Sequence, residues 1–193
     1  MPQSVSGGRR RQPRPATPER LEKAAYAYLE RFATSAENLR RVLMRRVERS
    51  ARLHDTDREA GARAVDAIVA RFRENGLVDD RVYAEGRAVS LARRGDSPRL
   101  VRRKLAQKGV EAGLIDDTLA GLDAEMGDLA LASAIRLARR RRLGPFRQAD
   151  RQARREKDMA ALARAGYGYD IARQVIEAED ETALEAMLEE AGG

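Results

Sequence analysis

The chain has 193 residues, with 38 Lys and Arg against 31 Asp and Glu, and a formal net charge of +7. Aromatic residues make up 4%, and the absence of cysteine excludes disulfides, thiol nucleophiles and cysteine-based zinc or iron–sulfur sites. The N-terminal residues lack the apolar run of a secretory signal, and no apolar stretch approaches the roughly 18 residues of a membrane span. We therefore expect a cytoplasmic protein that is built from highly charged helices and is not bound to a membrane.

The N-terminal residues 1–16 are Gly, Pro, Ser, Gln and Arg with little to bury, which predicts a disordered basic tail. Thr17 and Pro18 then read as the N-cap and first residue of a helix. Its apolar face repeats at helical spacing and is formed by Leu21, Ala24, Ala25, Tyr28, Leu29 and Phe32.

Further helices are predicted from capping residues at their starts and from glycines at their ends. Ser35 caps the second helix, which turns Leu39, Val42, Leu43 and Val47 inward, and the third ends at Asn75 and Gly76. Later helices are predicted over residues 79–95, 97–109, 112–122, 128–142, 148–165 and 169–178, and a piece of half a turn or two around 184–188.

The helices recur in groups of three. Leu29, Ser35 and Leu43 match Leu91, Ser97 and Leu105 at one constant spacing. We therefore predict an all-α fold of three tandem three-helix, helix-turn-helix-like repeats in an elongated curved array. The predicted segments are a tail at 1–16, repeats at 17–76, 77–126 and 127–179, an insertion at 141–151 within the third repeat, and an acidic C-terminal extension at 180–193.

Positive charge gathers in two stretches, which favours contacts with DNA phosphates or with an acidic protein surface. Solvated helix ends are the plainer interpretation, because arginine is favoured near the C-terminal end of a helix dipole. The scarcity of aromatic residues argues against base stacking. The candidate binding residues are Arg93, Arg94, Arg99, Arg102, Arg103, Lys104, Lys108, Arg139, Arg140, Arg141, Arg142, Arg147, Arg151, Arg154, Arg155 and Lys157.

Residues that could support catalysis are few. The acidic pairs Asp79–Asp80 and Asp116–Asp117 are expected to cap helix starts, and His54 lies in a polar loop without catalytic partners. The chain also lacks phosphate-binding and dinucleotide-binding glycine motifs. We therefore predict a protein that is not an enzyme and needs neither a metal nor a cofactor.

Four tyrosines are candidates for contact with a partner. Tyr28 and Tyr83 are expected in the core with the hydroxyl at the rim. Tyr167 and Tyr169 flank a helix stop, where exposure is expected.

Residues 76–110 resemble the core signature of the RecX family, the regulatory proteins of the RecA recombinase. The matching residues are Gly76-Leu77-Val78-Asp79-Asp80, then Tyr83-Ala84, and Leu105-Ala106-Gln107-Lys108-Gly109. The resemblance extends over about 18–179 and implies tandem three-helix repeats that bind in the groove of a RecA–single-stranded DNA filament. It also implies inhibition of ATP hydrolysis, strand exchange and coprotease activity, with weak binding to DNA alone. The insertion at 141–151 and the acidic segment 180–190 depart from the family pattern.

A second interpretation is an independent transcription regulator that binds duplex DNA through a helix-turn-helix-like unit. It depends on Arg99, Arg102 and Arg103, which share one helix face. Only Gln107 accompanies them as a residue suited to reading adenine, and no dimerisation surface is evident, so we expect a monomer.

Overall fold

The computed structural model describes residues 14–192, and in that part of the chain it contains ten α-helices, one 3-10 helix and no strand. The predicted all-α class is therefore confirmed. The chain divides into two compact units, unit 1 (Met1–Val78) and unit 2 (Asp79–Gly193). No helix in the described residues is long and apolar enough to cross a membrane.

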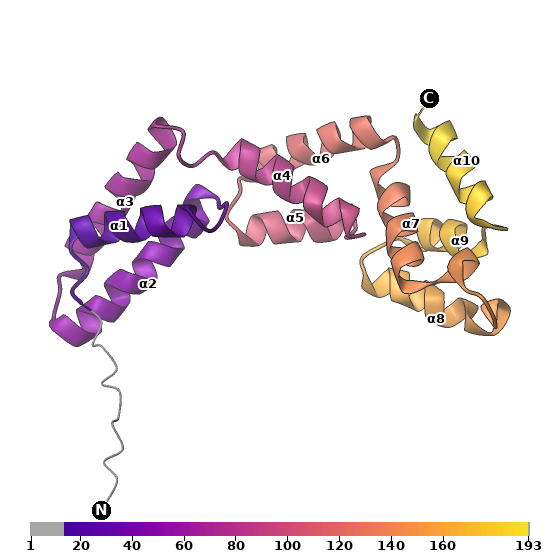
Figure 1. Cartoon of the computed structure of the whole chain (residues 1–193), viewed down its shortest axis with the longest axis horizontal. Helices are drawn as coiled ribbons and strands as arrows, with labels where there is room; N and C mark the ends of the chain where they lie inside the picture. The colour runs from indigo at the N-terminus through magenta and orange to yellow at the C-terminus, as the bar shows by residue number, and fades with distance from the viewer. Residues whose placement is uncertain (1–13, 193) are drawn as a thin grey trace, which may run out of the picture. The chain divides into compact units, whose positions relative to one another are not determined.

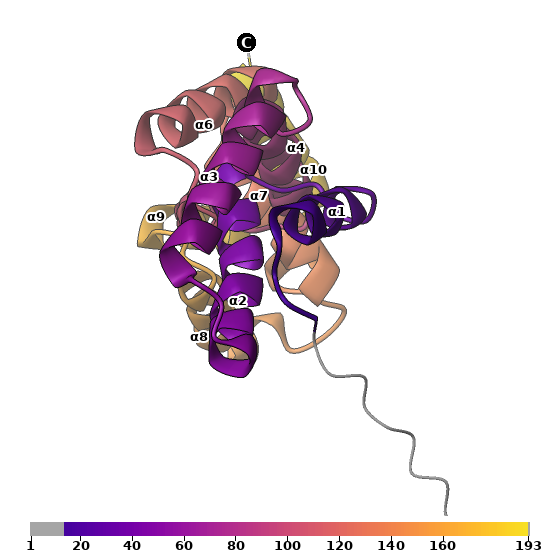
Figure 2. The same cartoon turned by 90° about the vertical axis from the view of Figure 1, so that its left-hand side faces the viewer.

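Unit 1 consists of α1 (Pro18–Leu29), α2 (Ala36–His54) and α3 (Arg58–Glu74) (Figures 1 and 2). The predicted caps are confirmed: the Thr17 hydroxyl accepts the Arg20 amide at 3.4 Å, and the Ser35 hydroxyl accepts the Asn38 amide at 3.2 Å. All three helices contribute to one apolar core, whose largest fully buried members are Leu21, Leu39, Leu43, Val47, Val65 and Phe72.

Two predictions for unit 1 are wrong in detail. Phe32 was expected on the inner face of the first helix, but α1 ends at Leu29 and the Phe32 side chain is 49% exposed. Residues 14–16 were assigned to the disordered tail, but the Ala16 amide donates to the Ser50 hydroxyl of α2 at 2.8 Å. The rest of that tail lies outside the described residues.

Unit 2 begins with α4 (Asp80–Arg93), α5 (Pro98–Gln107) and α6 (Ala112–Met126), and α4 lies beside α6 in Figure 1. Asp79 caps α4 as predicted, accepting the Arg81 and Val82 amides at 2.8 and 3.0 Å. Asp116 and Asp117 do not cap α6, because Glu111 takes that place and the pair lies inside the helix. Instead they form ion pairs with Arg102 and Arg81.

The remainder of unit 2 contains five elements. The predicted eighth helix starts later than expected, at Arg151, because a 3-10 turn and Asp150 in the left-handed conformation precede it. The predicted half-turn at the C-terminus is a full helix of 12 residues, whose buried Leu184 joins the core between α7 and α9. The five elements are α7 (Leu129–Arg141), η1 (Gly144–Phe146), α8 (Arg151–Arg164), α9 (Tyr169–Glu177) and α10 (Glu181–Gly192).

Three apolar clusters form in the described residues. The first gathers α1 to α3, the second gathers α4 to α6 with Leu129, and the third gathers residues 131–184. The repeat boundaries at 76, 126 and 179 remain predictions.

Candidate nucleic-acid interface

A tight joint connects the turn after α4 to α7. Gly95 has φ +77°, and a Cβ atom on it would lie 2.7 Å from the backbone nitrogen of Leu137. No side chain fits in that space, and the left-handed backbone itself favours glycine. The two backbones are therefore in direct contact, and residues that flank Gly95 in sequence lie close to residues that flank Leu137.

Two hydrogen bonds hold the same region to the turn after α8. The Ser97 hydroxyl donates to the Ala165 carbonyl oxygen at 2.9 Å, and the Tyr167 hydroxyl donates to the Gly95 carbonyl oxygen at 3.1 Å. Tyr167 is only 6% exposed, so the expectation of an exposed side chain is wrong, whereas Tyr169 is exposed as predicted. Burial is the main cause that raises the pKa of Tyr167 above its ordinary value of 10.0.

Four arginines adjoin this joint in the sequence of its two elements, and we call them the junction cluster: Arg93, Arg94, Arg136 and Arg140. Arg93 and Arg94 precede Gly95, and Arg136 and Arg140 flank Leu137 one turn apart on α7. Both α7 arginines are close enough to Tyr167 to lower its pKa against the effect of burial. All four are exposed, and none forms an ion pair with another described residue. Arg136 was not among the predicted residues; its i, i+4 spacing with Arg140 was the available signal.

Asp96 lies next to the junction cluster but does not neutralise it. Its carboxylate accepts the Lys104 ammonium at 2.5 Å, and its side chain is only 16% exposed. The charge of the four arginines is therefore available to an external anion. Like charges held close at an exposed surface attract polyanions, and binding is favoured further by release of the counterions condensed on the polyanion.

Helix α5 presents a mixed face. Arg99 and Arg103 are exposed and form no ion pair in the part of the chain that the structure describes, while Arg102 is held by Asp116. Lys104 is occupied by Asp96, and Lys108 is half-buried. Of the seven predicted basic residues of this stretch, Arg93, Arg94, Arg99 and Arg103 remain uncommitted.

Three predicted contact residues of the third repeat have structural partners instead. Arg147 donates to the buried Asp158 at 2.7 and 3.1 Å, and these hydrogen bonds raise the pKa of Arg147 above its ordinary value. Arg151 donates to the carbonyl oxygen of Ile176 in the last turn of α9 at 3.1 Å, and to those of Ala178 and Glu179 just after the helix. Arg155 pairs with Glu177. Arg147 and Arg151 hold the insertion and the end of α9 in place, and the pair of Arg155 with Glu177 lies at the surface.

The four consecutive arginines at the end of α7 do not share one environment. Arg139 lies over the Phe146 ring, 5.3 Å from its centre, and contacts Glu181 and Glu185 of α10 at 3.5 and 3.3 Å. Arg140, Arg141 and Arg142 are exposed and form no ion pair with a described residue. Arg154 and Lys157 of α8 are likewise exposed and form no ion pair with a described residue.

The described residues contain no group of three or more His, Asp or Glu side chains that could hold a metal ion. The arrangement is an exposed surface rich in arginine.

These features define an all-α protein of three-helix units that carries an arginine-rich surface. A family model described as RecX, second three-helix domain, matches residues 79–119. The regulatory protein RecX of Myxococcus xanthus is 41% identical over 170 residues, covering 86% of this chain and 89% of its own length. That of Thermobifida fusca is 33% identical over 185 residues, covering 93% and 94%. The chain belongs to the RecX family of regulatory proteins.

A solved crystal structure of a regulatory protein RecX supports the fold. It is 22% identical, has a TM-score of 0.55, and covers 82% of this chain and 72% of its own. At this identity the likeness concerns the arrangement of helices.

Proposed function

We propose that this protein is a non-enzymatic regulator that binds RecA–single-stranded DNA filaments and lowers their ATP hydrolysis, strand exchange and coprotease activity, in DNA repair and the SOS response. Membership of the RecX family supports a regulatory role. The observation that carries the proposal is the junction cluster, where four arginines from two repeats meet around Gly95 and Leu137 with no carboxylate committed to them in the described structure.

The proposed contact is electrostatic. Arg94 and Arg140 would bind backbone phosphates of the filament DNA, with Arg99 and Arg103 extending the same attraction along α5. The joint holds these arginines at fixed spacing. Once one arginine has bound a phosphate, the next arginine meets its phosphate at a high effective concentration, so the free energies of the contacts add. Arg147, Arg151 and Arg155 have structural roles in this proposal, which narrows the predicted binding set.

The test is DNA-dependent ATP hydrolysis by RecA on single-stranded DNA with this protein added. We expect hydrolysis to fall at well under one copy per RecA protomer, and the inhibition to weaken as salt concentration rises. No fall at any ratio would remove the recombinase from the proposal.

A pair of variants tests the junction cluster itself. Arg94→Ala with Arg140→Ala should raise the concentration needed for half-inhibition by roughly tenfold near physiological salt, as expected for two lost phosphate contacts. The matched control is Arg81→Ala with Arg173→Ala, which removes two exposed arginines whose 3.8 Å pairs with Asp117 and Glu177 are weak. Equal effects of the two variants would show that net charge, and not the cluster, matters.

A further inference from the structure

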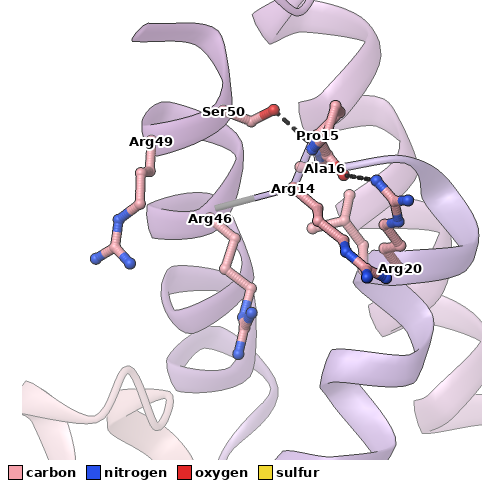
Figure 3. Close-up of a pocket in the computed structure, with 8 residues that line it drawn as sticks. Arg14, Pro15, Ala16, Arg20, Arg46, Arg49 and Ser50 are labelled. Carbon is pink, nitrogen blue, oxygen red and sulfur yellow. Dashed lines mark hydrogen bonds between the residues drawn. The ribbon is translucent and has the colours of Figure 1, made fainter. Parts of the chain in front are cut away.

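Unit 1 contains a pocket of about 300 Å³ between the segment that precedes α1 and the C-terminal half of α2. Figure 3 shows Arg14 and Arg46 extending in the same general direction from these two elements. The pocket combines four arginines with a small apolar floor, and its lining residues are Arg14, Pro15, Ala16, Arg20, Leu21, Arg46, Arg49 and Ser50.

The pocket is held in shape by hydrogen bonds (Figure 3). The Ala16 amide donates to the Ser50 hydroxyl at 2.8 Å, and the Arg20 guanidinium donates to the Pro15 carbonyl oxygen at 3.1 Å. Ser50 is buried, and its oxygen lies 2.6 Å from that of Thr56. The segment that carries Arg14 is therefore fixed against α2.

Nearby carboxylates are committed elsewhere. Glu48 lies between Arg46 and Arg49 in the sequence, but it pairs with Arg58 at 2.6 Å. Glu22 pairs with Arg71. The Glu19 carboxylate is hydrogen-bonded to Thr17, which lowers the pKa of Glu19. Excess positive charge thus remains in the pocket.

The arginines of the pocket, in contrast, lack counter-ions. Among the described residues, no ion pair is made by Arg14, Arg46 or Arg49. Other arginines of the same unit are paired, for example Arg40 with Asp66 at 2.7 Å and Arg41 with Glu37 at 2.8 Å. Guanidinium groups without counter-ions around one hollow concentrate positive charge at a single place, which favours the binding of an anionic ligand.

We propose that this pocket is a phosphate-binding site, which takes one phosphate group of a nucleic-acid backbone or of a nucleotide. Guanidinium groups match phosphate oxygens with paired hydrogen bonds, and a phosphate can accept from several sides at once. Arg14 and Arg46 would approach it from the two walls, while Leu21 offers apolar contact to the attached sugar. The site lies in unit 1 and does not depend on the junction cluster of unit 2.

The direct test is a nuclear magnetic resonance titration of the full chain, with the backbone amides of Ala16 and Ser50 as reporters. The probes are a short deoxythymidine oligonucleotide and, separately, ATP without metal. Saturable shifts with the oligonucleotide assign the site to nucleic-acid phosphates, and shifts with ATP alone assign it to nucleotides. No shift with either probe, or a shift only with a glutamate peptide, would overturn the proposal.

Variants locate the response. Arg14→Ala with Arg46→Ala should abolish the shifts and reduce the slope of log K against log salt for oligonucleotide binding by about 0.7, as expected for one lost phosphate on a single strand. The control Arg63→Ala with Arg73→Ala removes two exposed arginines of α3 and so makes the same change in charge, and it should leave both readouts unchanged. Equal losses in the two variants would overturn the site.

The outcome is separable from the proposed function. Pocket shifts without inhibition of RecA would retain the phosphate site and remove the recombinase proposal. Inhibition of RecA without pocket shifts would retain the recombinase proposal and remove the phosphate site.

Discussion

The hydroxyl of Tyr167 donates a hydrogen bond of 3.1 Å to the carbonyl oxygen of Gly95, joining the turn after α8 to the turn after α4. Alongside it, the Ser97 hydroxyl reaches the Ala165 carbonyl oxygen. A Cβ atom on Gly166 would lie 2.6 Å from that same hydroxyl oxygen. Hydrogen bonds and close packing thus meet at the turns that contain Gly95 and Gly166, and the effect of each contact on stability can be measured.

The first prediction concerns stability at high pH. The folded state raises the pKa of Tyr167 above the ordinary 10.0, chiefly by burial, so the folded protein favours the protonated phenol. This contribution is fully present below pH 10 and is lost as the pH rises through the folded pKa. The free energy of unfolding, measured in urea, should therefore decline above about pH 10. Tyr167→Phe should flatten that decline and cost about 1 kcal/mol at neutral pH. The exposed Tyr169→Phe should reproduce neither effect.

The second prediction concerns the joint between α4 and α7. Gly95→Ala combines a left-handed backbone, φ +77°, with a clash against Leu137. We expect a loss of about 2–4 kcal/mol in the free energy of unfolding of unit 2. Gly76→Ala is the comparison, since its φ is +68° but nothing lies within 4 Å of the added atom. That change should cost unit 1 only about 1 kcal/mol, measured by chemical denaturation. Equal losses in the free energy of unfolding for the two variants would mean that α4 and α7 can move apart enough to accept the added methyl group.

The third prediction concerns the anchor of the insertion. Asp158 is 3% exposed and accepts the Gly144 amide at 3.0 Å as well as the Arg147 guanidinium. Asp158→Ala leaves these donors without their acceptor and should lower the free energy of unfolding by about 2–4 kcal/mol. Glu177→Ala removes the acidic partner of Arg155 at an exposed position and should give no measurable loss of stability. Urea titrations of both variants distinguish a buried anchor from a surface pair.

The fourth prediction concerns α10. Glu181 and Glu185 contact Arg139, and their charges reduce the attraction of this helix end for anions. Glu181→Gln with Glu185→Gln should strengthen binding of single-stranded DNA severalfold at low salt, measured by fluorescence anisotropy, and the gain should vanish at high salt. Glu189→Gln with Glu190→Gln makes the same change in net charge on the same helix. If that control variant gained as much affinity, the contact with Arg139 would have no specific role.

Local signals in the sequence predicted most of the helices. Thr17, Ser35 and Asp79 are predictable as caps because a short polar side chain before a helix satisfies its first free amides, and this depends on neighbours in the sequence alone. The extent of α10 was underestimated, because its apolar face is short and Leu184 is buried only through the core of α7 and α9.

The candidate site was harder to predict, because a run of arginines does not reveal which members find carboxylates. Arg147 meets Asp158 only after the chain turns through η1, and Arg102 meets Asp116 only when α5 packs on α6. The pocket beside Arg46 and Arg49 of α2 forms only when the Pro15–Ala16 segment lies against Ser50, so no pattern within α2 reveals it. Pairing between elements is a tertiary property, and no periodicity in the chain encodes it.

The anchoring of the insertion bears on how the family can change. Both ends of the α7–α8 segment are fixed, at Leu137 by Gly95 and at Ala165 by Ser97, while the added residues lie between these points and are held by Asp158. A change in the length or charge of this loop should therefore leave the arginines beside Gly95 where they are. The spacing of these arginines is set by the contact of Gly95 with Leu137 and does not depend on the loop.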